Sequence, residues 1–231
     1  MSKIKKITYN IIDYLFPQLL YKKKSFSQDG EDMLLASFYE NQKNYKGFFI
    51  DVGAHHPFRF SNTAFFYNQG WKGINIEPTP NLFKRFKKHR KRDINLNYGI
   101  GNGDTLTFYI FNEGALNTFD QNLAKERDGS KNGKYKIINK VSIQTQTLEN
   151  ILDNYLPKNQ IIDFLTIDVE GFDYQVLTSN NWGKYIPKYI MIECESSVEN
   201  LNNDPIYIFL KSKNYEYVGR TKRTSIFRHK D

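Results

Sequence analysis

Residues 47–57 read GFFIDVGAHHP. The first six residues form an apolar run that a single acidic side chain, Asp51, interrupts near its end, which is typical of a strand buried on both faces of a sheet. The small residues Gly53 and Ala54 follow, and a glycine at such a turn lets the backbone approach a ligand closely. This stretch predicts the first strand and turn of an α/β fold, in which a mostly parallel sheet carries helices on both faces.

Helical and strand patterns alternate on both sides of this stretch, which supports the same fold class. The expected strands are 47–52, 73–77, 95–100, 106–111, 164–169 and 189–195, followed by a terminal hairpin of 215–219 and 224–228. The expected helices run from a cap at Ser27 or Asp29 through Glu40, and over 62–69, 82–92, 147–155, 173–178 and 206–211. Residues 112–136 are rich in Gly, Asn and charge, and we interpret them as a long mobile loop that acts as a lid.

The composition fits one folded domain. The chain has 231 residues, of which 16% are aromatic and 25% charged, so it can bury enough apolar surface to avoid disorder. Its single cysteine, Cys194, excludes a disulfide framework and a cysteine-based zinc site. No apolar run is long enough to span a bilayer and no secretory signal is visible, so we expect a cytoplasmic protein.

Residues 1–24 stand apart from the domain that we expect at 25–231. Isoleucines and leucines recur there at helical spacing between flanking lysines, which predicts one basic amphipathic helix ending near Pro17. The helix either packs on the domain or lies peripherally on the inner, anionic face of a membrane.

Four of the expected strands end in acidic residues: Asp51, Glu77, Asp168 and Glu193. Ligands of open α/β sheets bind beyond the carboxyl ends of the strands, and an acid after the second strand can accept both hydroxyl hydrogens of a ribose. An adenosine-containing ligand therefore fits. His56 and Pro57 occupy the places of the later glycines of a dinucleotide fingerprint, so the turn suits an adenosine ligand without phosphates, such as S-adenosylmethionine.

Several motifs together resemble the FkbM family of S-adenosylmethionine-dependent methyltransferases. They are SQDGED at 27–32, DVGAHHP at 51–57, SNT at 61–63, GWKG at 70–73, IEP at 76–78 and IDVEG at 167–171. The resemblance covers about residues 25–195. It implies a class I methyltransferase (Rossmann-like) fold, with a seven-stranded sheet that has an antiparallel terminal strand, and O-methylation of a sugar or natural-product hydroxyl, with S-adenosyl-L-homocysteine as the product.

The resemblance also implies roles for individual residues. Asp51, Gly53 and Ala54 would line the methionine portion of the cofactor, Glu77 and Pro78 would hold the ribose, and Gly99 and Ile100 would border the adenine. Gln28 and Asp29 would close over the cofactor. The segment 61–63, which contains Asn62, is expected to cap the next helix, whose positive N-terminal end would help to bind the cofactor carboxylate.

Methyl transfer to an alcohol needs a group that removes the hydroxyl proton. Asp168 is the first candidate, because it ends an apolar strand and the chain turns away just after it; alternatively it caps the following helix. His55 ranks second, and Glu170 is a further candidate base or a ligand of the methionine amine. His56 and Glu193 complete the set. Asp168, Glu193 and Glu195 could ligate Mg²⁺, but their spacing is no motif and we expect no metal site.

The formal net charge of +8 is compatible with several acceptors. We expect a small-molecule or glycan acceptor, a sugar of a surface glycan or its nucleotide- or lipid-linked precursor, and a phosphorylated precursor would explain the charge. The basic run at 84–92 is typical of a solvated helix face. The alternatives are a nucleic-acid methyltransferase or binding protein, although no nucleic-acid module is visible, a nicotinamide-dependent oxidoreductase, and a cofactor-binding homologue without activity.

Overall fold

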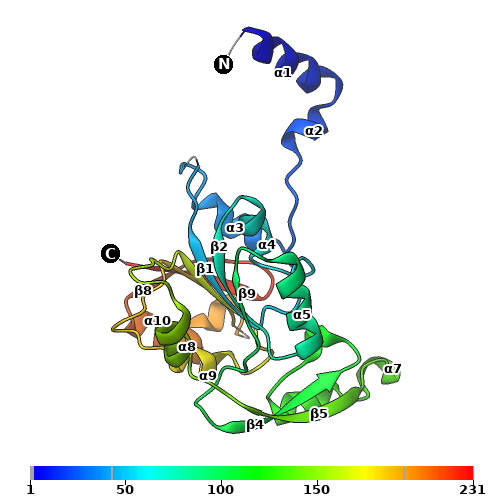
Figure 1. The fold of residues 1–231 in the computed structure, drawn as a ribbon, viewed down its shortest axis with the longest axis vertical. Helices are drawn as coiled ribbons and strands as arrows, with labels where there is room; N and C mark the ends of the chain where they lie inside the picture. The colour runs from blue at the N-terminus through cyan, green and yellow to red at the C-terminus, as the bar shows by residue number, and fades with distance from the viewer. Residues whose placement is uncertain (1–2, 43, 195, 231) are drawn as a thin grey trace.

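The computed structural model describes residues 3–42, 44–194 and 196–230, and its central element is a seven-stranded sheet (Figure 1). The strand order is β3-β2-β1-β6-β7-β9-β8. The strands are β1 (Phe48–Val52), β2 (Lys72–Ile76), β3 (Ile94–Leu96), β6 (Phe164–Ile167), β7 (Tyr189–Glu193), β8 (Tyr215–Arg220) and β9 (Thr224–His229). β1, β2, β3, β6 and β7 pair in parallel, and β9 runs antiparallel to both of its neighbours. The expected class I fold is confirmed.

Both faces of the sheet are buried, as the apolar strand sequences predicted. Successive residues of β1 point to opposite faces, so that Ile50 joins the core cluster that contains Leu177 and Leu210, whereas Phe49 joins the cluster that contains Phe66 and Trp71. The covering helices are α3 (Glu31–Ser37), α4 (Ala64–Asn68), α5 (Pro80–His89), α8 (Leu148–Tyr155), α9 (Asp173–Thr178) and α10 (Pro205–Ser212). The 3-10 helix η2 (Val198–Asn203) precedes α10.

A second, two-stranded sheet lies at the edge of the domain (Figure 1). It pairs β4 (Thr105–Phe111) with β5 (Ile137–Gln144) in antiparallel fashion. The strand at 106–111 was predicted, but its partner was not. The segment between the two strands is also no structureless loop, because it contains η1 (Gly114–Leu116), α6 (Gln121–Arg127) and α7 (Ser130–Gly133). The prediction of a mobile loop at 112–136 was therefore wrong about its secondary structure.

Three local predictions also need correction. The strand expected at 95–100 is only β3, and Ile100 makes an isolated bridge to Gln146. The N-cap residue of α3 is Gly30 at φ +89°, although the hydroxyl of Ser27 accepts the N–H of Asp32 in the first turn at 3.3 Å and donates to the carboxylate of Asp32 at 2.9 Å. α3 ends at Ser37 rather than at Glu40.

Arg90 is a further correction, since the basic run that contains it was interpreted as a solvated face. Its side chain is fully buried and donates to Asp93 at 2.8 Å, to the carbonyl of Pro57 at 3.1 Å and to the hydroxyl of Thr63 at 3.1 Å. The guanidinium therefore ties the end of α5 to the loop that follows β1.

The N-terminal segment projects away from the sheet (Figure 1). It forms two helices, α1 (Lys3–Leu15) and α2 (Pro17–Tyr21), and α1 ends just before Pro17 as predicted. Large apolar side chains remain exposed on both helices, among them Tyr14 at 87% and Leu19 at 70%. Among the described residues, no helix is long and apolar enough to cross a membrane.

Candidate active site

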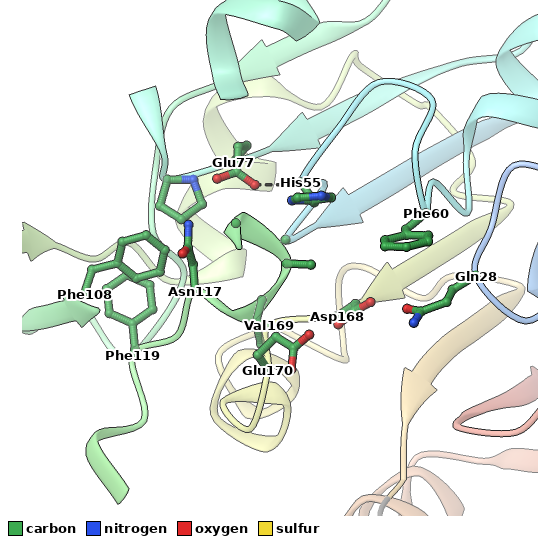
Figure 2. Close-up of a pocket in the computed structure, with 14 residues that line it drawn as sticks. Gln28, His55, Phe60, Glu77, Phe108, Asn117, Phe119, Asp168, Val169 and Glu170 are labelled. Atoms are coloured by element: carbon green, nitrogen blue, oxygen red, sulfur yellow. Dashed lines mark hydrogen bonds between the residues drawn. The ribbon is translucent and has the colours of Figure 1, made fainter. Parts of the chain in front are cut away.

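A pocket lies at the carboxyl ends of β1, β2 and β6, where the strand order of the sheet reverses (Figure 2). The space between its walls, out to the open mouth, is about 610 Å³. Seven of the predicted site residues line it: Gln28, Gly53, His55, Glu77, Pro78, Asp168 and Glu170. The structure thus brings together residues that are far apart in the sequence.

The turn after β1 joins three strands at this point. The N–H groups of Gly53 and Ala54 donate to the carbonyl of Ile76 at 3.0 and 3.1 Å, which ties the turn to the end of β2. Gly53 has φ +80°, and a Cβ atom there would lie 1.9 Å from the carbonyl oxygen of Asp168. Only glycine allows β1 and β6 to approach so closely at the floor of the pocket.

Glu77 follows β2 and is buried in the pocket wall (Figure 2). Its carboxylate accepts backbone N–H groups from His55 at 2.8 Å and from Thr79 at 2.7 Å, one on each oxygen. Burial nevertheless raises the pKa of Glu77 to about 7. Each carboxylate oxygen keeps a second acceptor site, so the side chain can still bind two hydroxyl groups of a ribose.

Asp168 follows β6, and its backbone N–H donates to the carbonyl of Val52 at 3.0 Å. Its half-buried side chain lies in the pocket and makes no hydrogen bond or ion pair with the described residues (Figure 2). Burial, with help from the neighbouring carboxylates of Glu193 and Glu170, raises the pKa of Asp168 well above its usual range. The alternative role as a helix cap is not seen, because the N-cap of α9 is Phe172, without a side-chain cap, and Asp173 accepts the N–H groups of Val169 and Gly171 in the preceding turn. A free carboxylate of raised pKa suits a general base.

Two of the other four candidate bases, His55 and Glu170, are placed differently. His55 lies in the pocket, its buried Nδ1 has no hydrogen-bond partner, and burial lowers the pKa of its imidazole to about 4. It is therefore neutral at pH 7 and able to bond a ligand. The carboxylate of Glu170 accepts from Arg127 of α6 at 2.5 Å, and the carbonyl of Glu170 accepts from Thr118 at 2.7 Å. Glu170 thus holds the segment between β4 and β5 against the end of β6.

Three pocket residues other than glycine have left-handed backbone angles: His55 at φ +52°, Phe60 at φ +56° and Glu170 at φ +55°. Such angles cost free energy in residues with a Cβ atom, and they concentrate at functional sites. Their gathering around one cavity marks the pocket as the functional part of the domain.

Six predicted cofactor residues do not line the pocket: Asp29, Asp51, Ala54, Asn62, Gly99 and Ile100. Asp51 is buried behind the turn, where its carboxylate accepts from Thr63 at 2.7 Å, and burial raises its pKa to about 6. Asn62 does not cap α4, since it donates to the hydroxyl of Thr166 at 3.0 Å and the N–H of Ala64 at the start of α4 donates to Ser61 at 3.1 Å. Asp29 pairs with Arg223 at 2.9 Å. Their roles in binding the cofactor remain predictions.

The sequence interpretation missed half of the pocket wall. The missed residues are Phe60, Phe108, Gly114, Ala115, Asn117, Phe119 and Val169. Phe108 and Phe119 pack with ring centroids 4.6 Å apart and ring planes tilted by 42°, and Asn117 beside them donates to Thr79 at 3.2 Å (Figure 2). Four of these residues lie in the segment 112–136. The interpretation of that segment as a lid was the only signal in the sequence that it contacts the site.

Within the described ranges, no group of three His, Cys, Asp or Glu side chains is placed to hold a metal ion. Burial raises the pKa of Glu193 to about 7. Glu195, the other acid considered as a ligand, lies outside the described residues.

Three features together are those of a class I methyltransferase. They are a mostly parallel sheet with a pocket at the point where its strand order reverses, an acid after β2 and a carboxylate after β6 without a partner among the described residues. The sequence profile of the Methyltransferase FkbM domain matches residues 51–217. The chain therefore belongs to the FkbM methyltransferase family, and its cofactor is S-adenosylmethionine. No curated protein matches the chain significantly.

Several solved structures are similar to the chain at low identity. An FkbM methyltransferase from Methylobacillus flagellatus KT is 13% identical, with a TM-score of 0.44 over 80% of this chain and 44% of that one. The chain thus spans less than half of that protein. A human methyltransferase 10 domain containing protein is also 13% identical, with a TM-score of 0.44 over 97% and 93%. A Burkholderia thailandensis 1,6-didemethyltoxoflavin-N1-methyltransferase, solved with S-adenosylhomocysteine, is 9% identical, with a TM-score of 0.41 over 100% and 92%.

Proposed function

We propose that the enzyme is an O-methyltransferase that acts on a sugar hydroxyl, in a surface glycan or its nucleotide- or lipid-linked precursor. The observation that carries this proposal is the carboxylate of Asp168, which has no partner among the described residues and lies in the same pocket as Glu77, the acid that we assign to the ribose. An alcohol has to lose its proton as it attacks, and Asp168 is the pocket carboxylate without a partner among the described residues.

The reaction is an in-line displacement at the methyl carbon. The acceptor oxygen attacks this carbon, the bond from carbon to sulfur breaks, and its electron pair stays on sulfur, which leaves neutral S-adenosylhomocysteine. The hydroxyl proton moves to the carboxylate of Asp168 and then to solvent. The protein's main contribution is to hold the oxygen about 3 Å from the methyl carbon with the three atoms in line.

The other pocket residues support this chemistry by binding and orientation. The carboxylate of Glu77 accepts hydrogen bonds from the ribose hydroxyls, and the tight turn at Gly53 lets the cofactor lie against the backbone. The neutral imidazole of His55 offers its unpartnered Nδ1 to the cofactor or to the acceptor hydroxyl. Phe108 and Phe119 supply an apolar wall suited to the flat adenine ring.

Calorimetric titration tests the cofactor and the active site together. S-adenosylmethionine and S-adenosylhomocysteine are titrated into the wild-type protein and Glu77→Ala, with NADH as the competing ligand. The proposal expects micromolar binding of the first two and a loss in the variant. NADH binding that survives Glu77→Ala would point to an oxidoreductase instead.

The acceptor is tested by transfer of a labelled methyl group to a panel of sugars, nucleotide sugars, lipid-linked sugars and RNA. Label that appears in an ether linkage on a sugar supports the proposal. Transfer to RNA alone, or binding of the cofactor without any transfer, would contradict it.

We also propose that the N-terminal segment brings the enzyme to an anionic membrane surface. The exposed apolar side chains of α1 and α2 and the exposed lysines Lys22, Lys23 and Lys24 support this placement. Amphipathic helices of this kind bind membranes through apolar burial and attraction to anionic lipids.

A further inference from the structure

A second cavity opens beside the active-site pocket, with about 920 Å³ between its walls out to the mouth. The two cavities share four wall residues, Gln28, Phe60, Ala115 and Glu170. The free carboxylate of Asp168 directly precedes this shared wall in the chain, through Val169 to Glu170. A molecule in the second cavity can therefore extend a hydroxyl toward the proposed base.

Four cationic side chains from four separate segments line this second cavity. Arg59 comes from the loop after β1, Arg127 from α6, Lys131 from α7 and Arg223 from the turn between β8 and β9. The carboxylates in its wall are those of Glu113 and Glu170. The lining of the second cavity therefore has more cationic than acidic side chains, whereas the neighbouring active-site pocket is rich in carboxylates.

The existing ion pairs leave part of this charge uncompensated. Arg59 pairs with Glu113 at 2.9 Å, Arg127 with Glu170 at 2.5 Å and Arg223 with Asp29 at 2.9 Å, so that three of the four cations are paired. Lys131 has no carboxylate within ion-pair distance among the described residues, and its ammonium lies over the ring of Tyr135 at 5.4 Å. A guanidinium has five donors, so each paired arginine also keeps N–H groups for a further anion.

We infer that this cavity binds a phosphate or diphosphate group of the acceptor. The geometry suits such a group because arginines and lysines that converge from several segments form charge-assisted hydrogen bonds to phosphate oxygens. The inference rests on the proposed function and narrows its substrate class. The diphosphate occupies the cationic cavity, and the sugar attached to it reaches past Glu170 toward Asp168.

The first test titrates inorganic pyrophosphate into the full-length protein, with and without saturating S-adenosylhomocysteine. We expect binding in both conditions, with an affinity that falls as salt is raised. Pyrophosphate that competes with S-adenosylhomocysteine would be bound in the cofactor pocket and would overturn the inference, as would an absence of binding. Failure of S-adenosylhomocysteine to bind would instead contradict the proposed function, while the titration without it still decides the phosphate site.

The matched variants are Lys131→Gln and Lys134→Gln. Both remove one exposed lysine that lies over the ring of Tyr135, at 5.4 and 5.5 Å, but only Lys131 lines the cavity. We expect Lys131→Gln to weaken pyrophosphate binding about tenfold and Lys134→Gln to change it less than about twofold. Lys131→Arg should restore most of the affinity. Equal effects of the two glutamine variants would mean that pyrophosphate responds to the general positive charge of the surface and not to this cavity, which would overturn the inference.

The carrier of the diphosphate is distinguished by competition against pyrophosphate with UDP and with geranyl diphosphate. Tighter binding of UDP indicates a nucleotide-linked acceptor, and tighter binding of geranyl diphosphate indicates a lipid-linked one. If neither displaces pyrophosphate, the cavity does not accept a substituted diphosphate and the inference is wrong.

Discussion

The backbone N–H of His55 donates to Oε2 of Glu77 at 2.8 Å, which fixes the turn after β1 against the acid that follows β2. Thr79 donates to the other oxygen at 2.7 Å. The carboxylate is thus oriented by the backbone before any cofactor binds. Preorganisation of this kind reduces the entropy cost of binding, because the side chain does not have to be ordered by the ligand.

Glu77→Ala should weaken the binding of S-adenosylhomocysteine by about 1 to 3 kcal/mol, because the ribose hydroxyls lose a charged acceptor. Isothermal titration calorimetry measures the change. Glu216→Ala serves as the control, since Glu216 lies on β8 in an exposed pair with Arg228 and outside the pocket. Unchanged affinity in Glu77→Ala would contradict the proposal that Glu77 binds the ribose.

Asp168→Asn should reduce kcat by roughly 10²-fold or more while cofactor affinity stays within a few-fold of wild type. The amide keeps the shape of the side chain but does not take up the hydroxyl proton. Because the pKa of Asp168 is raised, the wild-type rate should rise with pH as this carboxyl loses its proton. Single-turnover transfer of a labelled methyl group measures the rate.

Asp163→Asn is the matched control for Asp168→Asn, since Asp163 lies just before the same strand, β6, at its opposite end. Its carboxylate accepts from the N–H of Phe48 at 2.8 Å and from Lys188 at 2.7 Å, far from the pocket residues in the strand. This variant should lower Tm and leave the rate of methyl transfer nearly unchanged. Near-normal turnover in Asp168→Asn would move the role of base to His55 or Glu170.

Gly53→Ala should destabilise the domain by about 2 kcal/mol or more beyond the cost of Gly103→Ala, and it should abolish cofactor binding. Both glycines have positive φ, +80° and +89°, so both substitutions impose backbone strain, which costs about 1 to 2 kcal/mol. A Cβ at Gly53 would also meet the carbonyl oxygen of Asp168 at 1.9 Å, whereas nothing lies within 4 Å of a Cβ at Gly103. Chemical denaturation measures the difference, and equal losses in the two variants would contradict the close approach.

The sequence predicted the central sheet better than the site. The strands of the sheet are apolar runs between Gly, Pro and acidic residues, and burial on both faces makes that pattern plain at β1 and β6. β5 was missed because none of its eight residues is buried and apolar and polar residues alternate only over 141–144. Its pairing with β4 depends on contacts between distant segments that no local pattern encodes.

The acids at the strand ends were found because the topology of a parallel sheet carries them to one edge. Asn117 and Phe119 could not be found in this way, since they reach the pocket only through the packing of the segment between β4 and β5. The burial of Arg90 was missed for a related reason. It lies in a run of solvated cations, and only the tertiary partners Asp93, Thr63 and Pro57 draw it inside.

The apo protein should lose stability as pH rises from about 4 to about 8. Burial raises the folded-state pKa of Asp51 to about 6, of Glu77 and Glu193 to about 7, and of Asp173 to about 8. Unfolded carboxyl groups titrate near pH 4, so the folded protein holds more protons than the unfolded chain within this window. The stabilisation is fully present below the unfolded pKa and is lost as pH rises through the folded values.

Differential scanning calorimetry of the wild type and Asp173→Asn between pH 5 and pH 8.5 measures this effect. The wild-type Tm should fall across the range, and Asp173→Asn should flatten the slope because the group with the highest of these pKa values no longer titrates. A wild-type Tm that rises with pH would show that the buried carboxyls are not protonated in the folded state.

The full-length protein should sediment with vesicles that contain phosphatidylserine and remain in solution with vesicles of phosphatidylcholine alone. Lysines near an anionic bilayer contribute about 1 kcal/mol each, and apolar side chains that enter the interface add to this. Removal of residues 1–24 should abolish sedimentation and leave the Tm of the domain unchanged, since the exposed side chains of α1 and α2 stabilise little else.

Leu19→Asp and Ile161→Asp provide a matched pair, because both residues are exposed, at 70% and 59%, but only Leu19 lies in the segment. Leu19→Asp alone should reduce vesicle binding. A drop in Tm after the truncation, together with unchanged sedimentation, would mean that the segment packs on the domain and does not bind the membrane.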